Sequence, residues 1–266
     1  MAQLHCNFFS YSLGYGVDFT LLLPSFSPCD MDRKDGRTHA IPGKYPILYL
    51  LHGHGNDYMS WNRFTCIERY AEERRIAVVT FSVGNKGYMN AAYGENYYDF
   101  VEKELPEFLK ANFPISDRPE DTYIAGASMG GYGALAHAFG HPESYRAVGA
   151  FSPATAWRHD PSYNEATVDR LGHEMPEMMD LYETLDQDLK DGKKLPDIFC
   201  CMGERDFLLE SGERFRQYLE EKQVAHRYDL LPEYEHEWAI WEKELPEFLD
   251  WLPRTDLYAG MEKHKM

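Results

Sequence analysis

The sequence predicts a doubly wound α/β fold built on one mostly parallel sheet, and three observations support this. Continuous apolar runs, typical of strands buried on both faces, recur along the chain. Segments with helical spacing lie between them. Two apolar segments near the amino end, 3–13 and 17–24, are separated by Gly14 and Gly16 and predict an antiparallel edge. Strands that alternate with helices build a parallel sheet covered on both faces.

The elements follow in order along the chain. Buried strands are expected at residues 45–52, 76–83, 121–128, 145–152, 195–203 and 225–233. Helices are expected at residues 63–75, 95–112, 130–140, 211–223 and 237–252. Pro106 should kink or interrupt the second of these helices, because proline lacks a backbone donor. Residues 28–44 are polar and are expected to form a surface loop.

One stretch breaks the alternation of strands and helices. Residues 153–194 contain Pro161, Pro176, paired methionines and many acids, but no apolar run that reads as a buried strand. We predict a single domain spanning 1–266, in which 153–194 is a cap or lid inserted above the carboxyl ends of the strands. A surface excursion without such a role is the alternative.

Composition narrows the class of partner and the compartment. The chain has 266 residues, 44% of them hydrophobic, and a formal net charge of −17. That charge argues against nucleic acid, whose phosphates need clustered Lys and Arg, and gives no reason to expect a membrane partner. The five cysteines lack zinc-site spacing, and no secretory signal or membrane span is apparent. We expect free thiols, a cytoplasmic protein and no metal. The oligomeric state is open, a homo-oligomer included.

A G-x-S-x-G pattern, Gly126-Ala127-Ser128-Met129-Gly130, lies between an expected strand and an expected helix. This is the setting of a nucleophile elbow, in which a strained serine stands at a sharp turn. The glycines let neighbouring chain pass without a Cβ clash, and the first amides of the helix can meet a developing oxyanion. We predict that Ser128 is a nucleophile. A Gly/Ser-rich turn without chemistry is the alternative.

A serine hydroxyl needs a base, and the base needs an acid to orient it. His236 follows the last apolar strand and precedes the last helix, so it is the expected base; His226 begins a strand and reads as structural. Asp206 follows the strand 195–203 and is the expected acid, because a turn acid beside apolar Phe207 should be well buried. Glu204 is its main competitor.

The transition state also needs hydrogen-bond donors. The backbone amide of Met129 is one expected donor, since it directly follows the serine. The other should come from the loop "LLHGHGND" (50–57), where the amide of His54 is the first candidate and that of Gly53 the next. The same loop also permits a metal site on His52, His54 and Asp57, the alternative. "HEWAI" lacks the second histidine of the zinc-protease motif, so the sequence gives no further support to a metal or any other cofactor.

Four segments together resemble a known group: "LLHGHGNDYMSW", "GASMGGYGAL", "GERDFL" and "HEWAIWEKELPEFLDWL". They are similar to the esterase D superfamily of α/β hydrolases, and most like its tributyrin esterase-like short-chain carboxylesterases. S-formylglutathione hydrolases and feruloyl esterases are relatives. The resemblance covers nearly the whole chain. It implies the α/β-hydrolase fold, a triad of Ser128, Asp206 and His236, and an oxyanion hole from the amides of His54 and Met129. Many relatives carry a glycine one or two residues before the final histidine, where this chain has Tyr234-Glu235.

We therefore expect a serine carboxylesterase that hydrolyses short-chain acyl esters, acetyl-sugar or feruloyl esters among them, through an acyl-enzyme and without a cofactor. An S-formylglutathione hydrolase and an acyltransferase are alternatives with the same triad. A non-catalytic binding module is the alternative from another class, and it predicts a missing triad member. Gly53 is a further candidate substrate contact. Six aromatic residues are expected near the site, where they either line a substrate pocket or pack in the core: Tyr88, Tyr93, Tyr97, Tyr98, Trp157 and Tyr163.

Overall fold

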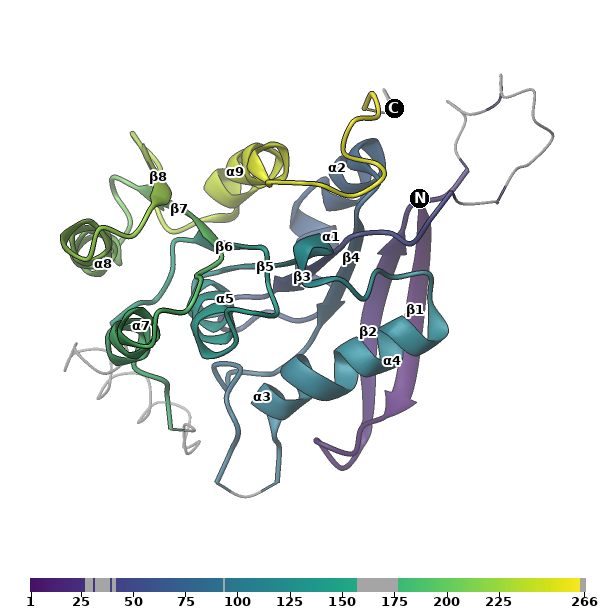
Figure 1. Cartoon of the computed structure of the whole chain (residues 1–266), viewed down its shortest axis with the longest axis horizontal. Coiled ribbons are helices and arrows are strands. Elements are labelled where there is room, and N and C mark those ends of the chain that lie inside the picture. The colour runs from purple at the N-terminus through teal and green to yellow at the C-terminus, as the bar shows by residue number, and fades with distance from the viewer. Residues whose placement is uncertain (27–30, 32–38, 40–41, 93, 157–176, 264–266) are drawn as a thin grey trace.

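The protein is built on a twisted sheet whose strand order is β1-β2-β4-β3-β5-β6-β7-β8 (Figure 1). The computed structural model describes residues 1–26, 31, 39, 42–92, 94–156 and 177–263. Within these residues the strands are β1 (Ala2–Phe9), β2 (Gly16–Leu23), β3 (Ile47–Leu51), β4 (Ala77–Phe81), β5 (Thr122–Ala127), β6 (Ala147–Phe151), β7 (Asp197–Gly203) and β8 (His226–Leu231).

The strand pairing confirms the predicted doubly wound sheet with an antiparallel edge. Strands β1 and β2 pair antiparallel, and β2 also pairs antiparallel with β4. The six strands β4, β3, β5, β6, β7 and β8, in sheet order, run parallel to one another. Every residue of β3 is buried, and its side chains alternate between two cores on opposite faces of the sheet. A strand buried on both faces must be apolar throughout, which explains the continuous runs in the sequence.

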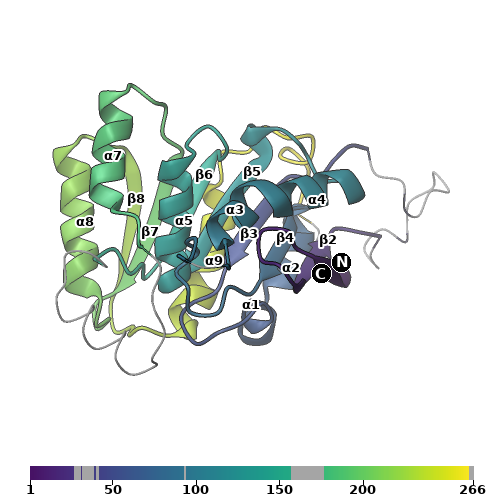
Figure 2. The same cartoon turned by 90° about the horizontal axis from the view of Figure 1, so that it is seen from below.

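Helices cover both faces of the sheet (Figure 2). One core holds side chains from α1 (Ser60–Phe64), α2 (Ile67–Arg74) and α9 (Trp238–Trp251). The other holds side chains from α4 (Leu105–Asn112), α5 (Met129–Gly140), α7 (Leu181–Lys190) and α8 (Leu209–Glu221). A short 3₁₀ turn, η3 (Pro119–Asp121), precedes β5. Because the six strands from β3 to β8 run parallel, their carboxyl ends lie at the same edge of the sheet, and the candidate site is at this edge.

The expected helix at 95–112 is interrupted, as Pro106 predicts. It consists of α3 (Tyr97–Asp99), a π-helical segment η2 (Phe100–Glu104) and α4, in which Pro106 stands in the first turn. α4 continues directly from η2, and the N–H of Leu105 donates to the carbonyl of Phe100, five residues earlier. The π-helical segment therefore lies immediately before Pro106, which has no N–H of its own to donate. The last helix, α9, instead accommodates Pro246 in its interior.

The predicted cap falls partly outside the described residues, since 157–176 are among those not described. The described part of 153–194 includes α7, whose Leu181 and Leu185 are buried in the core beside α5. The hydroxyl of Tyr132 on α5 donates to the carbonyl of Met179 at 2.9 Å, just before α7. This end of the stretch is therefore packed onto the domain, and the division into domain and cap stays a prediction.

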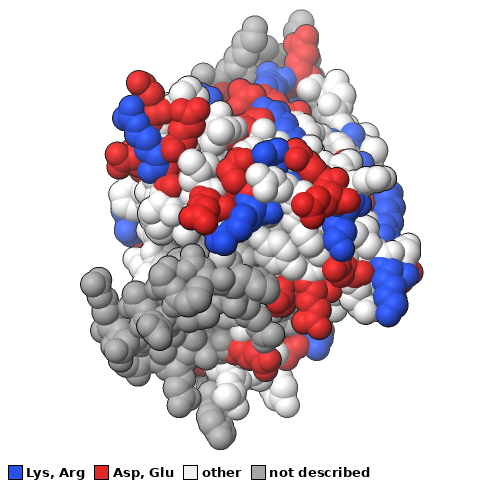
Figure 3. Space-filling model, turned by 90° about the vertical axis from the view of Figure 1, so that its left-hand side faces the viewer, with Lys and Arg blue, Asp and Glu red and all other residues white. Residues whose placement is uncertain are grey.

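The distribution of surface charge and the lengths of the helices are relevant to the expectation that neither nucleic acid nor a membrane is a partner. In the face shown in Figure 3, acidic and basic side chains lie side by side rather than in separate fields. Among the helices that the structure describes, none combines the length and the apolar character needed to cross a bilayer.

Candidate active site

Ser128 stands at a strained turn between β5 and α5. Its backbone has φ 57° and ψ −116°, a conformation that residues with a side chain rarely adopt. The turn leaves no room beside it: a Cβ on Gly126 would lie 2.4 Å from the carbonyl oxygen of Gly130. A Cβ on Gly130 would lie 2.5 Å from the carbonyl oxygen of Leu51 on β3. Both glycines of the G-x-S-x-G pattern are therefore required by close backbone approach.

The amide that follows the serine is oriented by the helix. Met129 is the first residue of α5, and the first N–H groups of a helix have no acceptor within it. Among the described residues, none accepts a hydrogen bond from the N–H of Met129. The helix dipole adds positive potential at the same point. This amide is free to donate to an oxygen held close to Ser128.

The structure brings His236 and Asp206 into contact. Nδ1 of His236 lies 3.0 Å from Oδ1 and 2.9 Å from Oδ2 of Asp206, whose side chain is buried. The N–H of Leu208 also donates to Oδ1, at 2.8 Å. A carboxylate that accepts these bonds requires the proton on Nδ1, which leaves Nε2 of His236 as the acceptor. The imidazole is thus held in the tautomer that a general base needs.

Backbone bonds explain why these two residues meet. The turn after β7 and the loop after β8 are joined by the N–H of Arg205, which donates to the carbonyl of Tyr234 at 2.9 Å. A Cβ on Gly203 would lie 2.3 Å from that same carbonyl oxygen. Tyr234 therefore contributes its backbone to the packing of the loop that carries His236.

The competitor Glu204 is exposed, so the buried carboxylate is Asp206. The physical reason given for preferring Asp206 is wrong, however. Phe207 does not bury the acid: its side chain is 72% exposed, and its ring packs against the imidazole of His236 with centroids 4.5 Å apart. A turn residue next to an apolar neighbour in sequence need not share its environment.

A second ring connects the imidazole to the serine turn. The indole of Trp241 on α9 meets the ring of His236 edge-on, with centroids 5.2 Å apart. Its Nε1–H donates to Oγ of Ser152 at 3.2 Å. The carbonyl of the preceding residue, Phe151, accepts the N–H of Ser128 at 2.8 Å. His236 and Ser128 are thus both joined to the carboxyl end of β6.

The loop after β3 lies beside the serine. A Cβ on Gly53 would lie 3.4 Å from Cβ of Ser128, so the backbone of this loop passes directly along the elbow. No described residue accepts a hydrogen bond from the N–H of His54. Its imidazole is half-buried, and burial lowers its pKa.

The same loop gives no support to the alternative metal site. Nε2 of His52 accepts the N–H of Val83 at 3.1 Å, and Nδ1 contacts the carbonyl of Gly53 at 2.8 Å, so both ring nitrogens are engaged. Within the described part of the chain, no group of three or more His, Cys, Asp or Glu side chains is arranged to hold a metal ion.

Of the aromatic candidates, two are buried, one is partly buried and three lie outside the described residues. Tyr98 is the partly buried one, and its ring stacks on that of His137 on α5 with centroids 4.5 Å apart. Tyr97 is 5% exposed, and its hydroxyl lies 2.7 Å from that of Tyr15. Tyr88 is fully buried in the same core. Tyr93, Trp157 and Tyr163 lie outside the described residues. The exposed ring beside His236 belongs instead to Phe207, which sequence analysis did not treat as a contact residue.

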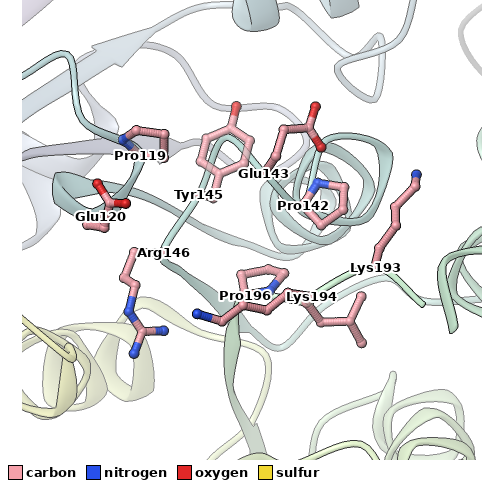
Figure 4. Close-up of a pocket in the computed structure, with 10 residues that line it drawn as sticks. Pro119, Glu120, Pro142, Glu143, Tyr145, Arg146, Lys193, Lys194 and Pro196 are labelled. Atoms are coloured by element: carbon pink, nitrogen blue, oxygen red, sulfur yellow. The ribbon is translucent and has the colours of Figure 1, made fainter. Parts of the chain in front are cut away.

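A surface pocket of about 380 Å³ lies at the opposite edge of the sheet (Figure 4). Its lining includes Pro119, the first residue of η3, and Arg146 and Pro196, which immediately precede β6 and β7. Arg146 is paired with Asp197 at 3.0 Å. These are the amino ends of the elements, so this pocket is separate from the candidate active site at their carboxyl ends.

The chain is similar to known esterases over nearly its whole length. A family model described as "Putative esterase" matches residues 37–252. The chain belongs to this family of esterases. It is 26% identical over 269 residues to an acetyl esterase of Caldicellulosiruptor saccharolyticus, covering 96% of this chain and 99% of the relative.

Solved structures of serine hydrolases have the same fold as this chain. FphF, a fluorophosphonate-binding serine hydrolase of Staphylococcus aureus, superposes on the esterase with a TM-score of 0.78 and 27% identity, covering 96% of this chain and 99% of that one. An S-formylglutathione hydrolase (FrmB) of the same organism gives a TM-score of 0.77 and 28% identity, covering 94% and 98%. The expected α/β-hydrolase fold and esterase D-like superfamily are confirmed. The esterase is a serine carboxylic ester hydrolase.

Proposed function

We propose that the esterase transfers the acyl group of a short-chain ester to water through a triad of Ser128, His236 and Asp206. The observation that carries the proposal is the imidazole of His236, held by the buried carboxylate of Asp206 at the edge where the strained Ser128 stands. A serine hydroxyl is a poor nucleophile, so acyl transfer by serine needs a base in the required tautomer and an acid that orients the base.

The steps follow from these groups. Nε2 of His236 takes the hydroxyl proton as Oγ of Ser128 attacks the ester carbonyl. The oxyanion that forms accepts hydrogen bonds from the N–H groups of Met129 and His54. The imidazolium then returns its proton to the departing alcohol, which leaves an acyl-enzyme. Water, deprotonated by the same nitrogen, attacks the acyl carbon. The bond between that carbon and Oγ of Ser128 then breaks, Oγ takes the proton back from the imidazolium, and the acid is released. The carboxylate of Asp206 stabilises the imidazolium in both halves of the cycle.

The substrate is proposed to carry a short acyl group. Support comes from the acetyl esterase of Caldicellulosiruptor saccharolyticus, which aligns with the chain over nearly its whole length. Because His236 must protonate the leaving oxygen, the alcohol portion departs past its ring. Phe207, whose exposed ring packs on that imidazole, is placed to contact the alcohol.

A thioesterase activity is the second candidate. It is favoured by the S-formylglutathione hydrolase of Staphylococcus aureus, which matches the chain at 28% identity. The same triad would act on either an ester or a thioester, so the two candidates differ only in the leaving group. Rates on 4-nitrophenyl acetate, an acetylated sugar, methyl ferulate and S-formylglutathione, compared as kcat/KM, distinguish them.

The experiment that tests the proposed nucleophile is covalent labelling. A fluorophosphonate should add once to the protein and map by peptide mass spectrometry to Ser128. Ser128→Ala should lose the label and about 10³-fold or more of the turnover. The matched control is Ser152→Ala, a buried serine at the end of the neighbouring strand, which should still be labelled. Full labelling of Ser128→Ala would remove this serine from the mechanism.

A further inference from the structure

We propose that His52 is a positioning residue, which holds the oxyanion-binding N–H of His54 in place through the carbonyl of Gly53. The inference rests on the proposed function, since it concerns how one part of that site is kept in its active geometry.

Three successive carbonyls, from the last residue of β3 into the loop, each face a buried side-chain donor. The carbonyl of Leu51 accepts Nε1–H of Trp61 at 2.9 Å. The carbonyl of His52 accepts the hydroxyl of Tyr88 at 2.8 Å. The carbonyl of Gly53 lies 2.8 Å from Nδ1 of the His52 ring itself, and it also accepts the backbone N–H of Asn56 at 3.2 Å. The donor side chains are at most 1% exposed, so water does not compete for these bonds.

The partners of the His52 ring fix its tautomer. Nε2 lies 3.1 Å from the backbone N–H of Val83, which can only donate, so this nitrogen carries no proton. In the neutral ring the proton is therefore on Nδ1 and is donated to the carbonyl of Gly53. Burial lowers the pKa of His52 and keeps the ring in this neutral form. The ring thus links the end of β4 to the loop after β3.

The peptide between Gly53 and His54 transmits this bond to the site. In a planar trans peptide the C=O and the N–H point in opposite directions, so holding the carbonyl of Gly53 fixes the direction of the N–H of His54. Glycine on one side leaves this peptide free to rotate at little steric cost. A Cβ on Gly53 would lie 3.4 Å from Cβ of Ser128, so a rotated peptide would withdraw its donor from the reacting centre. The His52 ring, which makes the shorter of the two bonds to this carbonyl, opposes that rotation together with the N–H of Asn56.

The two ring bonds can be separated by substitution. Asn places an amide nitrogen near the position of Nδ1, so His52→Asn keeps a donor for the carbonyl of Gly53 and loses the acceptor for Val83. Gln places its amide oxygen near the position of Nε2, so His52→Gln keeps the acceptor and loses the donor. If the ring matters only for packing the loop onto β4, the ranking of the two variants reverses.

The test measures kcat, KM and inhibitor affinity for both variants on 4-nitrophenyl acetate. Losing a whole oxyanion donor costs about 10²–10³ in kcat, so a misdirected one should cost roughly 10- to 100-fold. We expect this loss of kcat in His52→Gln, with little change in KM. The kcat of His52→Asn should be at least fivefold higher than that of His52→Gln. The Ki of an aryl trifluoromethyl ketone, whose hemiketal oxyanion occupies the same hole, should rise in His52→Gln by the factor that kcat/KM falls.

A second pair of variants separates positioning from loss of a buried bond. Tyr88→Phe removes the donor to the carbonyl of His52, and Tyr258→Phe removes a similar donor, 2.6 Å from the carbonyl of Gly43, which precedes β3 at the far end of the domain. Tyr258→Phe should keep the wild-type kcat. Tyr88→Phe should lower kcat less than His52→Gln does, because it leaves the carbonyl of Gly53 bonded.

The inference is overturned if His52→Gln folds and keeps the wild-type kcat and Ki, or if its kcat falls while the ketone binds as before. It is also overturned if His52→Asn is the slower variant. These outcomes are distinct from failure of the proposed function, which would appear as an unlabelled wild-type serine or as a fully active Ser128→Ala.

Discussion

Asp206→Asn isolates the role of the carboxylate, because the structure dictates how the new amide must lie. Oδ1 of Asp206 accepts the N–H of Leu208 at 2.8 Å, so the amide oxygen of the variant will take that position. The amide NH₂ then occupies the place of Oδ2, which lies 2.9 Å from Nδ1 of His236. A donor at this point forces Nδ1 to accept and moves the imidazole proton to Nε2. Nε2, the nitrogen that we propose as the base, then carries a proton and can no longer accept one.

The magnitude follows from that change of tautomer. The same substitution in the serine protease triad lowers kcat by about 10⁴ with the geometry intact, and we expect ~10³–10⁴ here. At 1.36 kcal/mol for each tenfold change, this is about 4–5 kcal/mol of transition-state stabilisation. Initial rates on 4-nitrophenyl acetate at neutral pH give kcat and KM, and circular dichroism checks the fold.

The matched control is Glu204→Gln, which neutralises the exposed acid two residues earlier in the same turn. It should change kcat by less than about twofold, because an exposed charge in water interacts weakly with the site. If Glu204→Gln lost more activity than Asp206→Asn, the assignment of the acid would be refuted. If both variants kept the wild-type rate, no carboxylate of this turn would orient the base.

Three further predictions concern the turn, the rim and the metal alternative. Gly130→Ala should lower the free energy of unfolding in urea by about 2 kcal/mol or more, since its Cβ would meet a backbone oxygen at 2.5 Å. The control is Gly16→Ala, whose Cβ would meet only the side chain of Asn7, at 3.4 Å, and which should cost less than about 1 kcal/mol. Phe207→Ala should raise KM for an acetylated sugar by roughly three- to tenfold, the loss of about 1 kcal/mol of ring contact, and leave KM for methyl acetate unchanged; equal shifts for both would contradict contact with the alcohol portion. Dialysis against EDTA should leave the rate on 4-nitrophenyl acetate unchanged, because both nitrogens of His52 already have protein partners, whereas a loss restored by added zinc would contradict this.

The sequence was sufficient for features that depend on local pattern. The apolar run at 45–52 predicts β3 because a strand with helices on both faces has no solvent-facing side. Gly126 and Gly130 could be predicted to admit close backbone, because G-x-S-x-G stood between a strand and a helix. Pro106 marked the interruption of a helix through its missing donor.

Features that depend on contacts between distant segments could not be predicted. The ring of His52 meets the N–H of Val83, 31 residues later, and nothing in the pattern "HGHGND" distinguishes that role from metal binding. The exposure of Phe207 depends on how the turn after β7 packs against the loop that carries His236. Tyr97 looked like a pocket residue, yet its hydroxyl meets Tyr15 of the β1–β2 turn.

The central claim is that Nε2 of His236 lies against Oγ of Ser128. A crystal structure of the fluorophosphonate adduct measures this distance directly, because the adduct fixes the serine oxygen in the reacting position. The account predicts a separation of about 2.6–3.2 Å, with the phosphonyl oxygen accepting the N–H groups of Met129 and His54. An adduct on Ser128 with the imidazole of His236 turned away, beyond the reach of a single bridging water, would contradict it.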